Sequence, residues 1–235
     1  MQPVTDDGRP LDSPRRTPLW VRVSSFAMGM WLAFALLLLQ LWMAGCLPEA
    51  MSGFMFRAST EYGVGATKED CAAVSNHVAS YLRGEKEDFQ LELNGVLLFN
   101  DREMAHMADV RELYRLLEQV LLCGTGAFLA LLAWQALFHQ QAKRAFRGGM
   151  VAMLLLVGVF ALGMVVDFHT FFSLFHLMLF TNDLWILDPA QSLLVRLMNR
   201  SFFTYLAVFI SLMWAGTCLM LLWLTTNSAR RRRKK

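Results

Sequence analysis

Two histidines have the neighbours expected of residues that transfer protons. His106 has Glu103 three residues before it and Asp109 three residues after it. On a helix this spacing places all three side chains near one stripe. A carboxylate beside an imidazole can accept its N–H and so fix its tautomer. A water-exposed amphipathic helix shows the same spacing without any function, so the pattern alone leaves both interpretations open.

His176 follows an apolar segment that is rich in phenylalanine. The residues before it form an aromatic ridge at helical spacing, made of Phe168, Phe171, Phe172 and Phe175. An ionisable group at membrane depth is costly and often marks a functional site. The alternative is a boundary residue whose polar atoms are merely satisfied. His169 would share the face of His176 at a distance of roughly 10 Å, which is too far for one metal ion.

Other polar and aromatic residues gather near the same apolar boundary. They are Asp167, Asp183, Trp185 and Asp188. Histidine and carboxylate suit several divalent ions, but these residues lack the compact spacing of a metal site, so no metal is predicted. His77, on an expected exposed helix, and His139, at the end of a span, are weaker candidates.

Several motifs that would indicate other chemistry are absent from the sequence. It contains no serine elbow, glycine-rich phosphate loop, HExxH helix or paired CxxC. The four cysteines do not have metal-ligand spacing. Cys46 and Cys71 fall on the same side of the expected membrane, yet two cysteines are too few to predict a disulfide. Hydrolysis by an activated Ser or Cys, phosphoryl transfer on a P-loop and typical zinc chemistry therefore have no support.

The composition places these residues in an integral membrane protein. Apolar residues make up 56% of the 235 residues and charged residues only 17%. Four apolar stretches are long enough to cross about 30 Å of hydrocarbon: 20–47, 120–139, 150–171 and 202–225. The first ends in Met43-Ala44-Gly45-Cys46, which resembles a lipoprotein cleavage box, but a complete span followed by further spans favours an uncleaved chain.

Charge placement predicts the orientation. Residues 1–22, the loop 140–149 and the tail after residue 225 carry 13 of the 22 Lys and Arg residues and three acids. By the positive-inside rule these segments are cytoplasmic, so both termini are predicted inside. The basic run 230–235 directly follows a span. It is interpreted as an anchor to anionic lipid headgroups, and no nucleic-acid partner is predicted.

The largest outer segment, 48–118, is predicted to fold as a small cap. Glycines make its first part turn-rich. A helix over 67–83, capped by Thr67 with Asp70, precedes a β-hairpin with a type I′ turn at Asn94-Gly95. Asn100 then caps a second helix, with Glu103 in the capping box, that leads directly or through a bend into the second span.

The second outer segment, 172–201, contains a short apolar run at 193–198 that cannot span the membrane. It is expected to form an interfacial or partly re-entrant helix. The predicted fold is thus an all-α integral membrane protein with a single domain, 1–235. It has four transmembrane helices, a small α+β extracytoplasmic cap (helix, β-hairpin, helix) and an interfacial helix between spans three and four.

Two stretches resemble the signatures of a known family. One is Phe99 to Val110, which contains His106-Met107-Ala108-Asp109. The other runs from Asp167-Phe168 through Phe175-His176 and Leu187-Asp188-Pro189 to Phe202-Phe203. They are similar to the four-span bacterial integral membrane proteins that include the lipoprotein intramolecular transacylase. Ser192 stands where an acid is expected, and Asn199-Arg200-Ser201 where a proline is expected.

This resemblance implies a reaction and a place for it. An acyl chain would move from the sn-2 ester of a diacylglyceryl-modified N-terminal cysteine to the α-amine of that cysteine, giving a lyso-form lipoprotein. His176 would act as general base and His106 would donate to the tetrahedral oxygen, with the roles exchangeable. The expected supporting or substrate-binding residues are Glu103, Asp109, Asp167, Phe175, Asp183, Trp185 and Asp188.

The implied partners are diacylated bacterial lipoproteins and membrane lipid, without a cofactor. The enzyme would lie in the bacterial cytoplasmic membrane with its active site facing outward; its oligomeric state is left open. One alternative is a non-enzymatic membrane protein whose acidic outer cap binds a partner protein. A transporter or channel is disfavoured because the spans show no repeated architecture.

Overall fold

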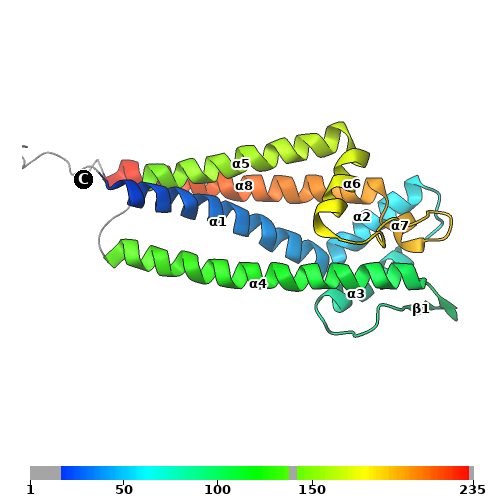
Figure 1. Ribbon diagram of the computed structural model, residues 1–235. Coiled ribbons are helices and arrows are strands. Elements are labelled where there is room, and N and C mark those ends of the chain that lie inside the picture. Colours follow the sequence, from blue (N-terminus) through cyan, green and yellow to red (C-terminus); the bar gives the residue numbers. More distant parts are fainter. Residues whose placement is uncertain (1–16, 138–141, 233–235) are drawn as a thin grey trace, which may run out of the picture.

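Four long apolar helices run side by side and carry all the remaining elements at one end (Figure 1). The computed structural model describes residues 17–137 and 142–232. The helices that are long and apolar enough to cross a membrane are α1 (Leu19–Cys46), α4 (Asp101–Leu137), α5 (Lys143–Val166) and α8 (Arg200–Arg232). The all-helical fold with four spans is thereby confirmed. Residues 1–16, the candidate His139 and the last three residues of the basic tail, 233–235, lie outside the described residues.

α1 is the central helix, with α5 and α8 on one side and α4 on the other (Figure 1). Its contact with α5 is close because each helix has a glycine that faces the backbone of the other helix. A Cβ built on Gly29 would lie 1.9 Å from the carbonyl oxygen of Phe146, and one on Gly149 would lie 2.0 Å from the carbonyl oxygen of Phe26. Small residues at such crossings let membrane helices approach closely, since lipid offers them no hydrophobic driving force.

α4 is a single helix that is much longer than a membrane requires. Its 37 residues correspond to about 55 Å at 1.5 Å per residue, whereas the hydrocarbon core is about 30 Å thick. The predicted span 120–139 is its second half as far as Leu137, and the predicted cap helix is its first half, joined without a break. Glu103, His106 and Asp109 therefore lie on the part of α4 that extends beyond the span.

The cap packs around one apolar core. It consists of α2 (Pro48–Glu61), α3 (Lys68–Leu82), the hairpin of β1 (Glu92–Leu93) with β2 (Val96–Leu97), the start of α4, and α7 (Leu193–Leu197). Its core includes Met55, Val74, Phe89, Met107 and Leu194. Because α7 and the start of α8 share this core, the segment between spans three and four is part of the cap.

Three local predictions for the cap are confirmed. Thr67 and Asp70 form the reciprocal capping box that starts α3. Asn94 and Gly95 have positive φ values of 53° and 78°, as a type I′ turn requires. The backbone N–H of Asn100 donates to the Glu103 carboxylate at 2.7 Å, and the Asn100 side chain accepts from the backbone N–H of Glu103 at 3.0 Å.

Two predictions for the cap were wrong. Residues 48–61 form the helix α2, not a turn-rich stretch. Pro48 occupies its first turn and Met51, Met55 and Ala58 bury one face, so helical periodicity outweighs the single Gly53. His77 was expected on an exposed surface but is only 4% exposed. Its Nε2 is 2.8 Å from the carbonyl of Phe89, which holds the following loop against α3.

The third span ends earlier than predicted. α5 ends at Val166, and a new helix, α6 (Phe168–Leu179), begins after Asp167. The Asp167 carboxylate caps α6 by accepting the N–H of Thr170 at 3.1 Å. The predicted span 150–171 is therefore interrupted, and the aromatic ridge lies on a separate helix of 12 residues. Likewise, the predicted loop 140–149 is helical from Lys143.

Candidate active site

The two histidines singled out by the sequence meet at the junction of the cap and the spans. The ring centroids of His106, on α4, and His176, on α6, are 6.1 Å apart. Both side chains are buried, at 8% and 7% exposure. Phe180 touches both rings, with centroids at 5.3 Å from His106 and 5.5 Å from His176. The pair therefore shares one apolar environment, called the histidine chamber below and defined by His106, His176 and the rings that contact them.

Aromatic rings surround His176. They are Phe172 at 4.0 Å, Trp185 at 4.8 Å, Phe175 at 5.4 Å and Phe180 at 5.5 Å between centroids. The Nδ1 atom of His176 lies 2.8 Å from the backbone carbonyl of Phe172. A carbonyl oxygen can only accept, so Nδ1 carries the proton and Nε2 keeps its lone pair in the neutral ring. Burial lowers the pKa of His176, and the bond to Phe172 opposes that shift.

His106 has an unsatisfied polar atom. Its Nδ1 is buried and has no hydrogen-bond partner. Burial, reinforced by the neighbouring charge of His176 and offset in part by Asp109, lowers the pKa of His106 to about 4. Both rings are therefore neutral near pH 7. A neutral imidazole offers one N–H donor and one lone pair, so the chamber holds a donor and an acceptor for a bound substrate.

Glu103 holds the cap together and does not orient His106. Its carboxylate is fully buried. Besides the bond from Asn100, its Oε1 atom accepts from the hydroxyl of Ser192 at 2.6 Å and from the backbone N–H of Leu194 at 2.7 Å. None of these donors is the imidazole of His106. Glu103 thus fastens the start of α7 to the first turn of α4.

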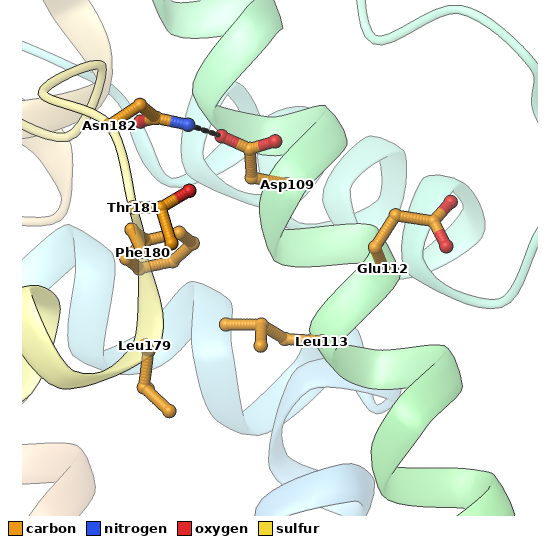
Figure 2. A pocket seen from close by; sticks show the side chains of 7 residues that line it. All are labelled: Asp109, Glu112, Leu113, Leu179, Phe180, Thr181 and Asn182. Atoms are coloured by element: carbon orange, nitrogen blue, oxygen red, sulfur yellow. Dashed lines mark hydrogen bonds between the residues drawn. The ribbon is translucent and has the colours of Figure 1, made fainter.

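Asp109 and Asp183 attach the segment after α6 to α4. Asn182 Nδ2 donates to Asp109 Oδ2 at 2.9 Å, as drawn in Figure 2. The Arg102 guanidinium donates to the backbone carbonyl of Asp183 at 2.5 Å and lies 3.5 Å from its carboxylate. These two contacts hold the segment that carries Trp185 over the histidine pair.

Three other candidates lie at a distance from the pair, and two of them shape the backbone. Asp167 starts α6, as described above. Asp188 accepts the N–H of Ala190 at its Oδ1 (2.9 Å) and the N–H of Ser192 at its carbonyl (2.8 Å), which forms the turn before α7. His169 is exposed on α6. None of these contacts brings the three residues to the imidazoles.

The two departures from the family pattern have structural roles. Ser192 is the N-cap of α7 as well as a donor to Glu103. Asn199 caps α8, because its Oδ1 accepts the N–H groups of Ser201 and Phe202 at 2.9 and 3.2 Å. Its Nδ2 donates to the carbonyl of Ala58 in α2 at 3.2 Å. Both residues satisfy helix ends that would otherwise be left unpaired.

Sequence reasoning missed Arg102 and the contact position of Phe180. Arg102 had one available signal: a cation in the first turn of a helix is unfavourable there, so it needs an external partner. Phe180 had none, because its contact with both rings depends on where the chain goes after α6. Within residues 17–137 and 142–232, no three or more His, Cys, Asp and Glu side chains converge as metal ligands would.

Comparison with known proteins agrees with this arrangement. The model of the family "Lipoprotein intramolecular transacylase Lit" matches residues 26–203. The crystal structure of the membrane-integral lipoprotein intramolecular transacylase Lit from Bacillus cereus is similar in fold, with a TM-score of 0.74 and 18% identity over 92% of this chain and 99% of that chain.

A variant of the same Bacillus cereus protein, with one histidine replaced by arginine, matches with a TM-score of 0.70 and 19% identity over 91% of this chain and 95% of that chain. A histidine-to-alanine variant matches with the same score and identity. Among curated proteins, no sequence matches significantly.

Proposed function

Because this chain belongs to the lipoprotein intramolecular transacylase Lit family, we propose that it moves an acyl chain from the sn-2 ester of a diacylglyceryl-modified N-terminal cysteine to the α-amine of that cysteine. The chain is an integral membrane enzyme that modifies lipoproteins. The non-enzymatic alternative thereby loses its support. The observation that carries the proposal is the 6.1 Å separation of two buried, neutral imidazoles at the boundary between cap and spans.

The reaction needs no enzyme nucleophile. The amine and the ester belong to one substrate, so holding them together makes the attack unimolecular. The amine nitrogen attacks the sn-2 carbonyl carbon, and a new C–N bond forms. The bond between that carbon and the glyceryl oxygen then breaks. The proton lost from nitrogen goes to the departing oxygen, which leaves an amide and a free sn-2 hydroxyl.

His176 is assigned as general base. Its Nδ1–H is held by the carbonyl of Phe172, so the lone pair of Nε2 is available to accept the proton that the nitrogen loses. A lowered pKa makes the ring a weak base toward a free ammonium ion, whose pKa is near 8. The ammonium ion has no lone pair, so it first gives one proton to water. His176 takes a second proton from the nitrogen during the attack, when the N–H becomes more acidic. The stacked Trp185 stabilises the imidazolium while it exists.

His106 is assigned as the donor to the tetrahedral oxygen. Its pKa of about 4 keeps it neutral, and a neutral imidazole N–H can still donate a hydrogen bond as charge develops on that oxygen. Its unpartnered Nδ1 is a buried polar atom that a bound substrate would satisfy. The departing glyceryl oxygen receives the proton that His176 took from the nitrogen, which returns both rings to the neutral state.

The proposed topology follows from charge. The cap lies at the end of the bundle opposite the start of α1 and the end of α8 (Figure 1). By the positive-inside rule the basic end faces the cytoplasm, so the cap and the histidine pair face outward in the bacterial cytoplasmic membrane. Diacylated lipoproteins are anchored in the outer leaflet of that membrane, within reach of the chamber.

The test is expression in a bacterium that lacks such an enzyme, followed by mass analysis of the N-terminal peptide of one lipoprotein. We expect conversion to an N-acylated, monoacylglyceryl cysteine. His106→Ala and His176→Ala should each abolish conversion while the protein still accumulates in the membrane. His169→Ala is the matched control, since His169 is exposed on the same helix as His176 and should leave conversion intact. A peptide that keeps its free amine and both glyceryl chains, with inserted protein present, contradicts the proposal.

A further inference from the structure

A cavity lies beside the histidine chamber, between α4 and the segment that follows α6. Its volume is about 190 Å³. Its lining residues are Asp109, Glu112, Leu113, Leu179, Phe180, Thr181 and Asn182 (Figure 2). Phe180 is shared with the chamber, where its ring contacts both imidazoles. The cavity is therefore separated from the reacting groups by one aromatic ring.

The lining changes from polar to apolar along α4. At one end Asp109 faces Asn182, and one helical turn further Leu113 faces Leu179 (Figure 2). The apolar end is the one nearer the bilayer, because α4 runs from the cap into its span. A cavity with this gradient suits an amphiphile whose polar group lies at the cap and whose chain enters the lipid.

The surroundings of α4 leave a lipid chain free to reach the cavity. α4 packs mainly on α1 and not on α5 or α8 (Figure 1). Leu179 is 40% exposed, so the apolar end of the cavity is open on the flank of α4 that faces away from α5 and α8. A substrate that is already anchored in the membrane can enter sideways, without leaving the bilayer.

The polar end has one carboxylate that is available to a cation. Asp109 Oδ2 accepts one hydrogen bond from Asn182, and the side chain is half-buried at the cavity wall. Glu112 is already paired with Arg115 at 2.5 Å. Asp109 is thus the group in the lining best suited to an ammonium ion.

We propose that this cavity is the subsite that receives the lipopeptide substrate, with the α-ammonium of its modified cysteine at Asp109 and one acyl chain passing between Leu113 and Leu179 into the bilayer. The inference rests on the proposed function and adds a binding role for Asp109, Leu113 and Leu179. It places the ammonium one helical turn from His106. After the ammonium gives one proton to water, the free amine is close enough to move to the imidazoles.

The test uses a ligand that binds but cannot react: a synthetic diacylglyceryl-cysteine peptide with an ether in place of the sn-2 ester and a tag at its C-terminus. The full-length protein, in nanodiscs, carries a photoreactive benzoylphenylalanine in place of Leu113. The control carries it in place of Leu162, which is lipid-exposed on α5 and outside the cavity. We expect the tagged peptide to label position 113 several-fold more than position 162. Equal labelling overturns the proposal.

Competition then tests the role of Asp109. An unlabelled peptide with a free amine should compete about tenfold better than the same peptide with an acetylated amine. Asp109→Asn, which keeps the bond to Asn182, should remove that preference, whereas Glu112→Gln should retain most of it. An unchanged preference in Asp109→Asn overturns the assignment. Displacement by phosphatidylglycerol as effective as by the free-amine peptide would show a general lipid site and also overturn it.

The outcome is independent of the reaction, because the ether cannot transfer its chain. If labelling follows the expected pattern but no lyso-form lipoprotein is produced in cells, the proposed function fails and the subsite remains. If conversion proceeds but position 113 is not labelled above position 162, the subsite fails and the proposed function remains.

Discussion

The carboxylate of Glu103 accepts a 2.6 Å hydrogen bond from the hydroxyl of Ser192. Glu103 lies in the first turn of α4, and Ser192 is the N-cap of α7. Both side chains are almost inaccessible to solvent. Glu103 is one helical turn from His106, and Ser192 follows the loop that carries Trp185. This bond therefore ties the backbone positions of the two halves of the site to each other.

Removing Glu103 should destabilise the cap more than removing its partner Ser192. Ser192→Ala deletes one bond to a buried carboxylate, which costs about 1.5–3 kcal/mol. Glu103→Ala should cost more, because it leaves Ser192, Leu194 and Asn100 without their acceptor. The measurement is thermal unfolding in detergent together with the conversion assay. A Glu103→Ala protein as stable as Ser192→Ala would show that the buried carboxylate contributes little.

Acid should destabilise the protein through His106. Its pKa is about 4 in the folded state and near 6.5 when unfolded, so the unfolded chain binds the proton more tightly. The free energy of unfolding should be fully retained above pH 6.5. It should then fall by at most about 1.4 kcal/mol per pH unit between 6.5 and 4. His106→Phe should reduce this slope in chemical unfolding curves measured at several pH values, whereas His169→Phe, on an exposed surface, should not.

Trp185 should affect turnover more than binding. Its ring stacks on His176 at 4.8 Å, and a cation over an aromatic face gains about 0.5–2 kcal/mol. That gain exists only while His176 carries the transferred proton. Trp185→Leu should therefore lower kcat about twofold to thirtyfold with a smaller change in KM, and Trp185→Phe should recover part of the loss. An effect confined to KM would place Trp185 in substrate binding instead.

The contact between α1 and α5 should not tolerate side chains. Gly149→Leu would drive its Cβ into the backbone of Phe26, 2.0 Å away, and separate the helices. Separating packed helices in this way lowers the free energy of unfolding by several kcal/mol, on the order of the largest single-mutation effects. The thermal midpoint in detergent should fall sharply, while Gly158→Leu on the same helix, where nothing lies within 4 Å, should change it little. Similar midpoints for the two variants would contradict this close packing.

Local sequence rules were sufficient for much of the fold. Apolar length predicted the four spans, because a membrane requires each crossing segment to be apolar and helical. The turn at Asn94-Gly95 and the cap of Asn100 with Glu103 were predicted because their hydrogen bonds join residues three or fewer positions apart. The sequence also identified His106 and His176 as candidates, because residue identity and spacing are properties of the chain alone.

Only the tertiary structure decided which of those residues meet. Glu103 and His106 lie three residues apart on α4, yet Glu103 binds Ser192 and His106 lies beside His176. The way the start of α4 packs against the rest of the cap sets these contacts. His77 is buried for a similar reason, since the loop after α3 folds back over it. Periodicity assigns a side chain to a face, but its partner comes from a segment tens of residues away, and no local pattern encodes that contact.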